Sequence, residues 1–252
     1  MVEGLNLFRE RFQSYTDSYV IIGGTACSEQ HARFGLEFRN TKDIDIVLCL
    51  DSLSAGEFGN VFIQFIKEGQ YSFQTTDERS NLARLLEPVS KEYPAKIELI
   101  TRRPIEGLIY KGQRKIPVSL SADLSDFSAF VMEAPYYNYL QSHKEIRDGL
   151  SIASVDCLMI LKVKAWLSLG EQRLRGVHID SDKIKKHKND FFRLYRLLIL
   201  NNKPEVPDVI KQDIQTFLSQ MTSGEVDLKS LKVDNRLDNI LTELYEYFGI
   251  AR

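Results

Sequence analysis

Two aspartates at alternate positions, Asp43 and Asp45, open an apolar segment that reads Asp-Ile-Asp-Ile-Val-Leu. Residues two apart on a β-strand project to the same face, so a strand over this segment would place both carboxylates side by side. Two adjacent carboxylates repel each other unless a cation compensates them. Proteins bind Mg²⁺ through one or two carboxylates together with water and substrate phosphates. The pair therefore predicts a magnesium site for a phosphorylated substrate.

A glycine pair upstream, Gly23-Gly24, directly follows the apolar segment Tyr19–Ile22. Glycine carries no Cβ atom, so the backbone can approach a ligand closely at this turn. The following residues have a helix-like pattern up to Gly35, and a helix N-terminus presents free N–H groups and a positive dipole end to an anion. Strand, glycine turn, helix and a second strand with paired aspartates together indicate a site for a nucleoside triphosphate and Mg²⁺. The alternative is an ordinary strand-to-helix turn followed by a polar strand start.

The two motifs, in this order, resemble those of nucleotidyltransferases of the polymerase-beta-like superfamily, and in particular the AbiEii/AbiGii toxin family. That family has Gly-Gly-Thr-Ala followed by Arg-x-Ser/Thr-x-Asp-Ile-Asp. This chain has Gly-Gly-Thr-Ala from Gly23 and Arg-Asn-Thr-Lys-Asp-Ile-Asp from Arg39. The resemblance implies that the substrate is bound by Gly23, Gly24, Thr25, Arg39 and Thr41.

The resemblance also implies a third carboxylate, contributed by a later strand. Glu98 is the candidate, in a strand-like run where Lys96 and Glu98 share one face, and Glu87 is its rival. Asp43, Asp45 and Glu98 would then bridge two Mg²⁺ ions about 3.5 to 4 Å apart. One ion would activate the acceptor oxygen, and the other would hold the triphosphate.

A further part of the resemblance lies in the second half of the chain. The family has Lys-x-x-Ala, an arginine and a lysine-rich helix start with an essential aspartate. The matching residues here are Lys162 to Ala165, Arg173 or Arg175, and Lys186 to Asp190. The resemblance implies that Lys162, with Lys164 as the alternative, neutralises phosphate charge, and that Asp190 orients Lys162 or acts as a base. The lysines between 183 and 188 are typical of a solvated helix start, with RNA phosphate contact as the alternative.

The elements that position these motifs fall into two groups. Helix-like spacing over residues 5–12 and 54–69 alternates with strand-like segments at 19–22 and 43–50, and short strand-like runs follow at 71–75, 82–86 and 95–100. This order predicts one mixed sheet. From residue 152, apolar residues recur at helical spacing and predict about four helices. The expected fold is an α/β (α+β) nucleotidyltransferase-like domain over residues 1–150, followed by an all-helical C-terminal domain over residues 151–252.

Composition restricts the class of protein further. The chain has 252 residues, of which 43% are hydrophobic and 27% charged, and its formal net charge is −2. No global positive field therefore attracts nucleic acid, so RNA would have to bind a local patch. No segment approaches the roughly 18 to 20 apolar residues of a membrane span. The three cysteines lie far apart without a paired motif, which indicates a reduced, cytoplasmic protein.

The expected function is Mg²⁺-dependent transfer of a nucleoside monophosphate from a nucleoside triphosphate to an acceptor. The resemblance makes RNA, particularly tRNA, the leading acceptor, with the protein itself or a small molecule such as an aminoglycoside behind it. A cognate antitoxin is implied as a partner by analogy only. Two other classes stay open: a nucleotide-binding or regulatory module without catalysis, and a protein-interaction domain without a nucleotide.

Overall fold

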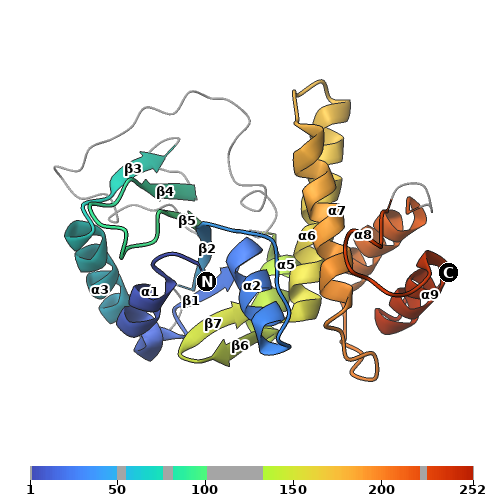
Figure 1. Ribbon diagram of the computed structural model, residues 1–252, viewed down its shortest axis with the longest axis horizontal. Helices are drawn as coiled ribbons and strands as arrows, with labels where there is room; N and C mark the ends of the chain where they lie inside the picture. Colours follow the sequence, from blue (N-terminus) through green and yellow to red (C-terminus); the bar gives the residue numbers. More distant parts are fainter. Residues whose placement is uncertain (1, 50–54, 76–81, 101–132, 222–225, 252) are drawn as a thin grey trace. The chain divides into compact units, whose positions relative to one another are not determined.

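The computed structural model describes residues 2–49, 55–75, 82–100, 133–221 and 226–251 (Figure 1). The chain forms two compact units, one made of residues 1–128 and 143–154 and the other of residues 129–142 and 155–252. The observed division differs from the boundary expected at residue 150, because residues 129–142 belong to the second unit and the chain then returns to the first. Residues 143–154 extend the sheet of the first unit.

Within the described residues, the first unit contains one mixed sheet of seven strands in the order β3-β4-β5-β2-β1-β7-β6. The strands are β1 Tyr19–Ile22, β2 Asp43–Leu48, β3 Ser72–Thr75, β4 Leu82–Leu86, β5 Lys96–Ile100, β6 Lys144–Arg147 and β7 Leu150–Ala153. Strand β2 pairs antiparallel with β1 and parallel with β5, and β1 pairs parallel with β7. The predicted mixed α/β architecture is confirmed. Strands β1 and β7, which have a neighbouring strand on both sides, are buried along their whole length.

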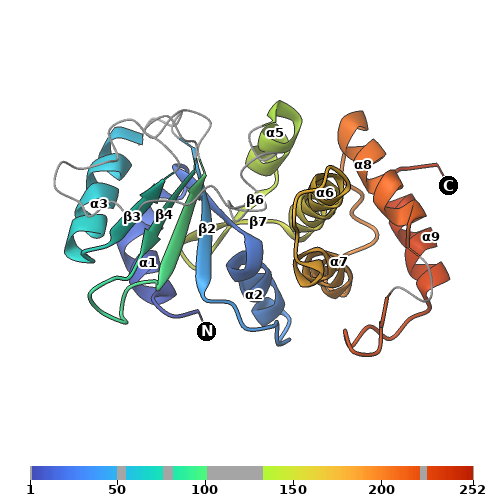
Figure 2. The same cartoon turned by 90° about the horizontal axis from the view of Figure 1, so that it is seen from above.

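The helices that the structure describes in the first unit are α1 Leu5–Phe12, the 3-10 helix η1 Gln13–Tyr15, α2 Gly23–Arg33 and α3 Ala55–Glu68. Helices α1 and α3 lie side by side (Figures 1 and 2) because their aromatic side chains pack together. The Phe12 ring centroid lies 5.6, 5.5 and 5.2 Å from those of Phe58, Phe62 and Phe65. This aromatic cluster joins both helices to β1 through Tyr19 and holds β1 and its glycine turn in place.

The hairpin β6–β7 was not predicted. Its two-residue loop is Asp148-Gly149, since Arg147 pairs with Leu150. Both loop residues have positive φ, 45° and 78°, as a type I′ turn requires. The Asp-Gly pair is the local sequence signal for this hairpin.

The regular elements that the structure describes in the second unit are helices. They are α5 Ala134–Ser142, α6 Val155–Leu174, α7 Ser181–Tyr195, α8 Asp208–Ser219 and α9 Leu237–Tyr247. The Phe217 ring of α8 contacts Trp166 of α6 and Phe191 of α7, with centroids 5.1 and 4.7 Å apart. Helix α7 begins after Asp180, whose side chain accepts a hydrogen bond from the backbone N–H of Asp182. None of the helices in the described ranges combines the length and apolar character needed to cross a bilayer.

All three cysteines, Cys27, Cys49 and Cys157, are buried, and none of them forms a disulfide. Burial raises the pKa of the Cys157 thiol well above its ordinary value, and the thiolate is the reactive form. We therefore expect a thiol reagent such as DTNB to modify the native protein at least about 100-fold more slowly than the denatured protein, since modification needs local opening. Release of thionitrobenzoate, followed by absorbance, measures both rates. Rapid modification of one equivalent in the native protein would contradict the described burial.

Candidate functional site

Strands β2 and β5 place a polar row on one face of the sheet. Asp43 lies opposite Lys96, and Asp45 lies opposite Glu98. Residues in register on neighbouring strands share a face, so these four side chains project together. The intervening Ile44 is buried on the other face. The sheet register therefore places the three carboxylates selected from the sequence on one face.

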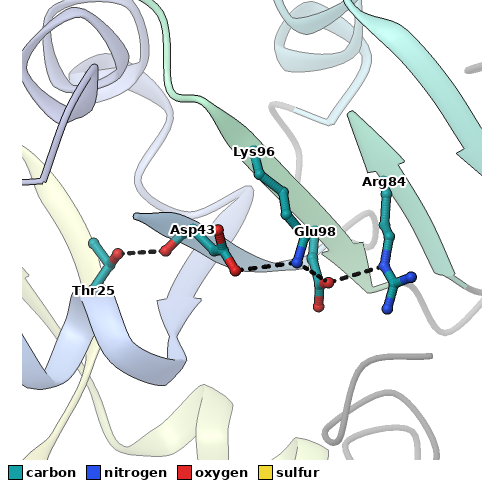
Figure 3. Close-up of polar contacts among 5 residues, drawn as sticks. All are labelled: Thr25, Asp43, Arg84, Lys96 and Glu98. Carbon is teal, nitrogen blue, oxygen red and sulfur yellow. Dashed lines mark hydrogen bonds and ion pairs between the residues drawn. The ribbon is translucent and has the colours of Figure 1, made fainter. Parts of the chain in front are cut away.

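Two cations of the protein already contact this row (Figure 3). The Lys96 Nζ lies 3.1 Å from Asp43 Oδ2 and 2.8 Å from Glu98 Oε1. The Arg84 Nε lies 3.0 Å from the same Glu98 oxygen, because β4 places Arg84 opposite Glu98. Burial alone would lower the pKa of the Lys96 ammonium, but the Glu98 and Asp43 carboxylates outweigh that effect and raise its pKa. Neither Lys96 nor Arg84 was expected to belong to the site.

The glycine turn lies directly against Asp45. Helix α2 begins at Gly23, which has a φ of +68°, and a Cβ atom there would lie 1.9 Å from Asp45 Oδ2. The Asp45 carboxylate therefore lies close to the N-terminus of α2, where the helix dipole stabilises negative charge. At Gly24 a Cβ atom would lie 2.5 Å from Thr41 Oγ1 and 3.7 Å from Arg39 Nη2. Both glycines thus adjoin other residues selected from the sequence.

Thr25 connects the helix to the aspartate strand. Its hydroxyl donates a 2.7 Å hydrogen bond to the backbone carbonyl of Asp43 (Figure 3), and its side chain is fully buried. In this arrangement Thr25 fixes the start of β2 relative to α2. Its predicted contact with substrate phosphate remains a prediction.

Arg39 adds positive charge beside the N-terminus of α2. Its guanidinium lies over the Phe38 ring, 5.1 Å from the centroid, and donates a hydrogen bond to the Asn40 carbonyl. Arginine binds phosphate through a planar set of N–H donors. The α2 N-terminus and Arg39 therefore form an electropositive region next to the carboxylates.

Glu87, the rival for the third carboxylate, lies outside the polar row. It follows the end of β4 with a φ of 54°, and its carboxylate accepts a hydrogen bond from the Ser72 hydroxyl. Arg84 and Leu86 are the β4 residues opposite Glu98 and Lys96. The sheet register thus favours Glu98 over Glu87.

Lys162 and Asp190 form a buried ion pair in the second unit. The Lys162 Nζ lies 3.0 Å from Asp190 Oδ2, and their side chains are 1% and 0% exposed. The Arg193 Nη1 lies 3.1 Å from the other Asp190 oxygen. The two side chains are therefore in contact, whereas the orienting role of Asp190 and the contact of Lys162 with phosphate stay predictions. Lys164, the alternative, pairs instead with Asp213 at 2.9 Å.

The donor set fits one hard divalent cation better than two. Over the described ranges, no group of three or more histidine, cysteine, aspartate or glutamate side chains is placed to hold a metal ion. Asp43 and Asp45 offer the carboxylate pair that Mg²⁺ uses alongside water and phosphate. The place between Asp43 and Glu98 is taken by the Lys96 ammonium. The expected two-ion site across Asp43, Asp45 and Glu98 therefore does not fit this arrangement.

No protein-family model matches the sequence, and no curated protein matches it. Among solved structures, the chain is similar to an antigenic nucleotidyltransferase-like protein from Paracoccidioides brasiliensis, with 17% sequence identity, a TM-score of 0.48, and 93% of each chain covered.

Replacing Gly23 by alanine should misplace Asp45, because the added Cβ would lie 1.9 Å from its carboxylate and the φ of +68° disfavours alanine. We expect a loss of about 1 to 3 kcal/mol in the free energy of unfolding. Any activity of this site should fall about 100-fold, since small displacements of catalytic groups have effects of that size. Urea unfolding measures the loss of stability, and an assay of nucleotide transfer measures the loss of activity.

Gly35→Ala is the matched control. Gly35 has a similar φ of +65°, but nothing lies within 4 Å of its Cβ position. This variant should carry the backbone strain alone and keep its activity. Equal losses of activity in both variants would show that the contact with Asp45 is unimportant.

Proposed function

We propose that this protein is a Mg²⁺-dependent nucleotidyltransferase, which transfers a nucleoside monophosphate from a nucleoside triphosphate to an acceptor. One observation carries the proposal: the Asp45 carboxylate lies against the glycine-initiated N-terminus of α2, and Asp43 shares its face of β2. Carboxylates suit a divalent cation, and a helix N-terminus suits phosphate. Their direct juxtaposition matches the two halves of a metal–triphosphate complex.

In the proposed reaction, Asp43 and Asp45 hold the cation, and the N–H groups at Gly23 and Gly24 bind the triphosphate together with Arg39. When bound, Mg²⁺ supplies polarisation of the phosphoryl oxygens. The acceptor hydroxyl forms a bond to the α-phosphorus while the bond to pyrophosphate breaks, and the hydroxyl proton passes to water through a carboxylate of the pair. Most of the rate enhancement in such a reaction comes from positioning and electrostatic stabilisation.

RNA, and tRNA in particular, is the acceptor that we propose. Support comes from the end of α6 and the start of α7, where Arg173, Arg175, Lys185 and Lys186 are exposed. Nucleic-acid phosphates bind local positive charge, and the whole chain has a net charge of −2, so these exposed residues, of which Arg175 also pairs with Glu171, are the proposed contact. A cognate antitoxin as partner is supported only by the family resemblance.

A label-transfer assay tests this function. Purified protein is incubated with Mg²⁺ and each nucleoside triphosphate in turn, labelled at the α-phosphate or at the γ-phosphate. The acceptors are total RNA, tRNA, an aminoglycoside, and the protein alone. We expect covalent label on tRNA from one α-labelled nucleotide and none from its γ-labelled form. Transfer of γ-label, or of α-label to the aminoglycoside alone, would overturn the proposed reaction or the proposed acceptor.

A nucleotide-binding module without catalysis is the second candidate. It is favoured by the two cations that neutralise Glu98, since a catalytic carboxylate would need to remain available to a ligand. This candidate predicts saturable binding of a nucleoside triphosphate without transfer to any acceptor. Equilibrium dialysis beside the label-transfer assay separates the two functions.

A further inference from the structure

We propose that the Lys96 ammonium is a fixed cation that takes the place of a second divalent ion. The site then holds one divalent ion, bound by Asp43 and Asp45, and Glu98 holds the Lys96 ammonium in position. This inference rests on the proposed function, because it concerns the same carboxylates. It also replaces the expected two-ion arrangement. The bridge that Lys96 forms between strands β2 and β5 is the observation that carries it (Figure 3).

The position of the ammonium is the first argument. An ion that bridged Asp43 and Glu98 would have to contact one oxygen of each carboxylate. The Lys96 Nζ already does so, at 3.1 Å from Asp43 Oδ2 and 2.8 Å from Glu98 Oε1. Lysine provides a compact point charge with several N–H donors, so one ammonium can serve both carboxylates. A divalent ion and this ammonium cannot occupy the same place.

The charge balance is the second argument. Lys96 and Arg84 place two positive charges against Glu98, and Lys96 also contacts Asp43. A second divalent ion would lie beside two fixed positive charges, which disfavours its binding electrostatically.

The surroundings of Glu98 are the third argument. Its side chain is 7% exposed, and both Arg84 and Lys96 contact its Oε1 atom. The Arg84 side chain is itself 14% exposed, so this ion pair is largely shielded from water. The Lys96 side chain is 28% exposed and that of Asp43 is 45% exposed. Glu98 therefore forms the closed end of the row, and Asp43 forms its accessible end.

Direct counting of bound Mn²⁺ tests the inference. Electron paramagnetic resonance of free Mn²⁺ gives the number of ions bound per chain in the absence of nucleotide. The wild type should bind one ion. Lys96→Met keeps the hydrocarbon stem but removes the charge, and we expect it to bind two ions, because Asp43 and Glu98 are then left without their bridging cation.

Matched variants separate this role from a general loss of charge. Lys96→Arg keeps a positive charge and should still bind one ion. Glu98→Gln should leave the single site at Asp43 and Asp45 in place, as should Glu87→Gln, which alters a carboxylate outside the row. Circular dichroism melts confirm that each variant is folded before its ions are counted.

Three results would overturn the inference: two ions in the wild type that fall to one in Glu98→Gln, a single ion in folded Lys96→Met with unchanged affinity, or no bound ion in the wild type. Its failure is distinguishable from failure of the proposed function. If the wild type transfers label but binds two ions, the inference is wrong and the proposed function stands. If the ion counts are as expected but the wild type transfers no label, the proposed function is wrong and the inference stands.

Discussion

Replacing Asp43 and Asp45 together by asparagine should abolish nucleotide transfer, with a fall of at least about 1,000-fold in kcat/KM, while the protein stays folded. The amide side chains keep the size of the carboxylates but lose the charge that binds a divalent cation, and a bound ion stabilises the transition state by several kcal/mol. The Asp43 side chain is 45% exposed, so loss of its ion pair with Lys96 should change the free energy of unfolding by only about 1 kcal/mol or less.

The label-transfer assay and urea unfolding measure these two effects on the same protein preparations. Asp17→Asn is the matched control, since its carboxylate is 78% exposed and only distantly paired with Lys144. It should transfer label at the wild-type rate. A wild-type rate in the double variant would exclude the aspartate pair from the chemistry. Loss of both transfer and nucleotide binding would show that the aspartate pair acts in nucleotide binding.

The second large effect concerns stability and comes from the buried pair of α6 and α7. Lys162→Met removes one partner of Asp190, whose side chain is fully buried, while the contact of Asp190 with Arg193 stays in place. Removal of one member of a buried pair leaves a desolvated charge and costs about 3 to 5 kcal/mol. We expect the free energy of unfolding, measured by urea titration at neutral pH, to fall by about that amount.

Two further variants make this prediction specific. Lys162→Met with Asp190→Leu removes both charges and should recover most of the lost stability, since apolar replacement of a buried pair is often neutral. Lys164→Met breaks a pair whose side chains are 20% and 25% exposed and should cost only about 1 kcal/mol or less. If Lys162→Met stayed stable but lost transfer, the lysine would have the phosphate role that the family resemblance implies.

The sequence alone was enough to predict the elements on which the candidate site is built. The apolar run Tyr19–Ile22 and the alternation that starts at Asp43 became β1 and β2, and the amphipathic first helix became α1. These predictions succeeded because local periodicity determines which face of an element is buried. The same argument placed Asp43 and Asp45 on one face, since that depends only on their spacing within one strand.

The division of the chain into units depended on tertiary structure. Residues 143–154 add their hairpin to the first unit, while residues 129–142 belong to the second. The Asp148-Gly149 pair specified the turn locally. The pairing of β7 with β1 depended on packing between strands far apart in the sequence, since Ile21 pairs with Ile152.

The electrostatics of the site were likewise decided by the tertiary structure. Sequence reasoning selected Asp43, Asp45 and Glu98 as carboxylates for metal, but only the parallel register of β2 and β5 places Lys96 opposite Asp43 and Glu98 opposite Asp45. The pairing of Lys162 with Asp190 similarly required α6 to pack against α7. Local sequence determines the face on which a side chain lies. The register between distant elements determines which charges meet, because it is set by packing of the whole unit.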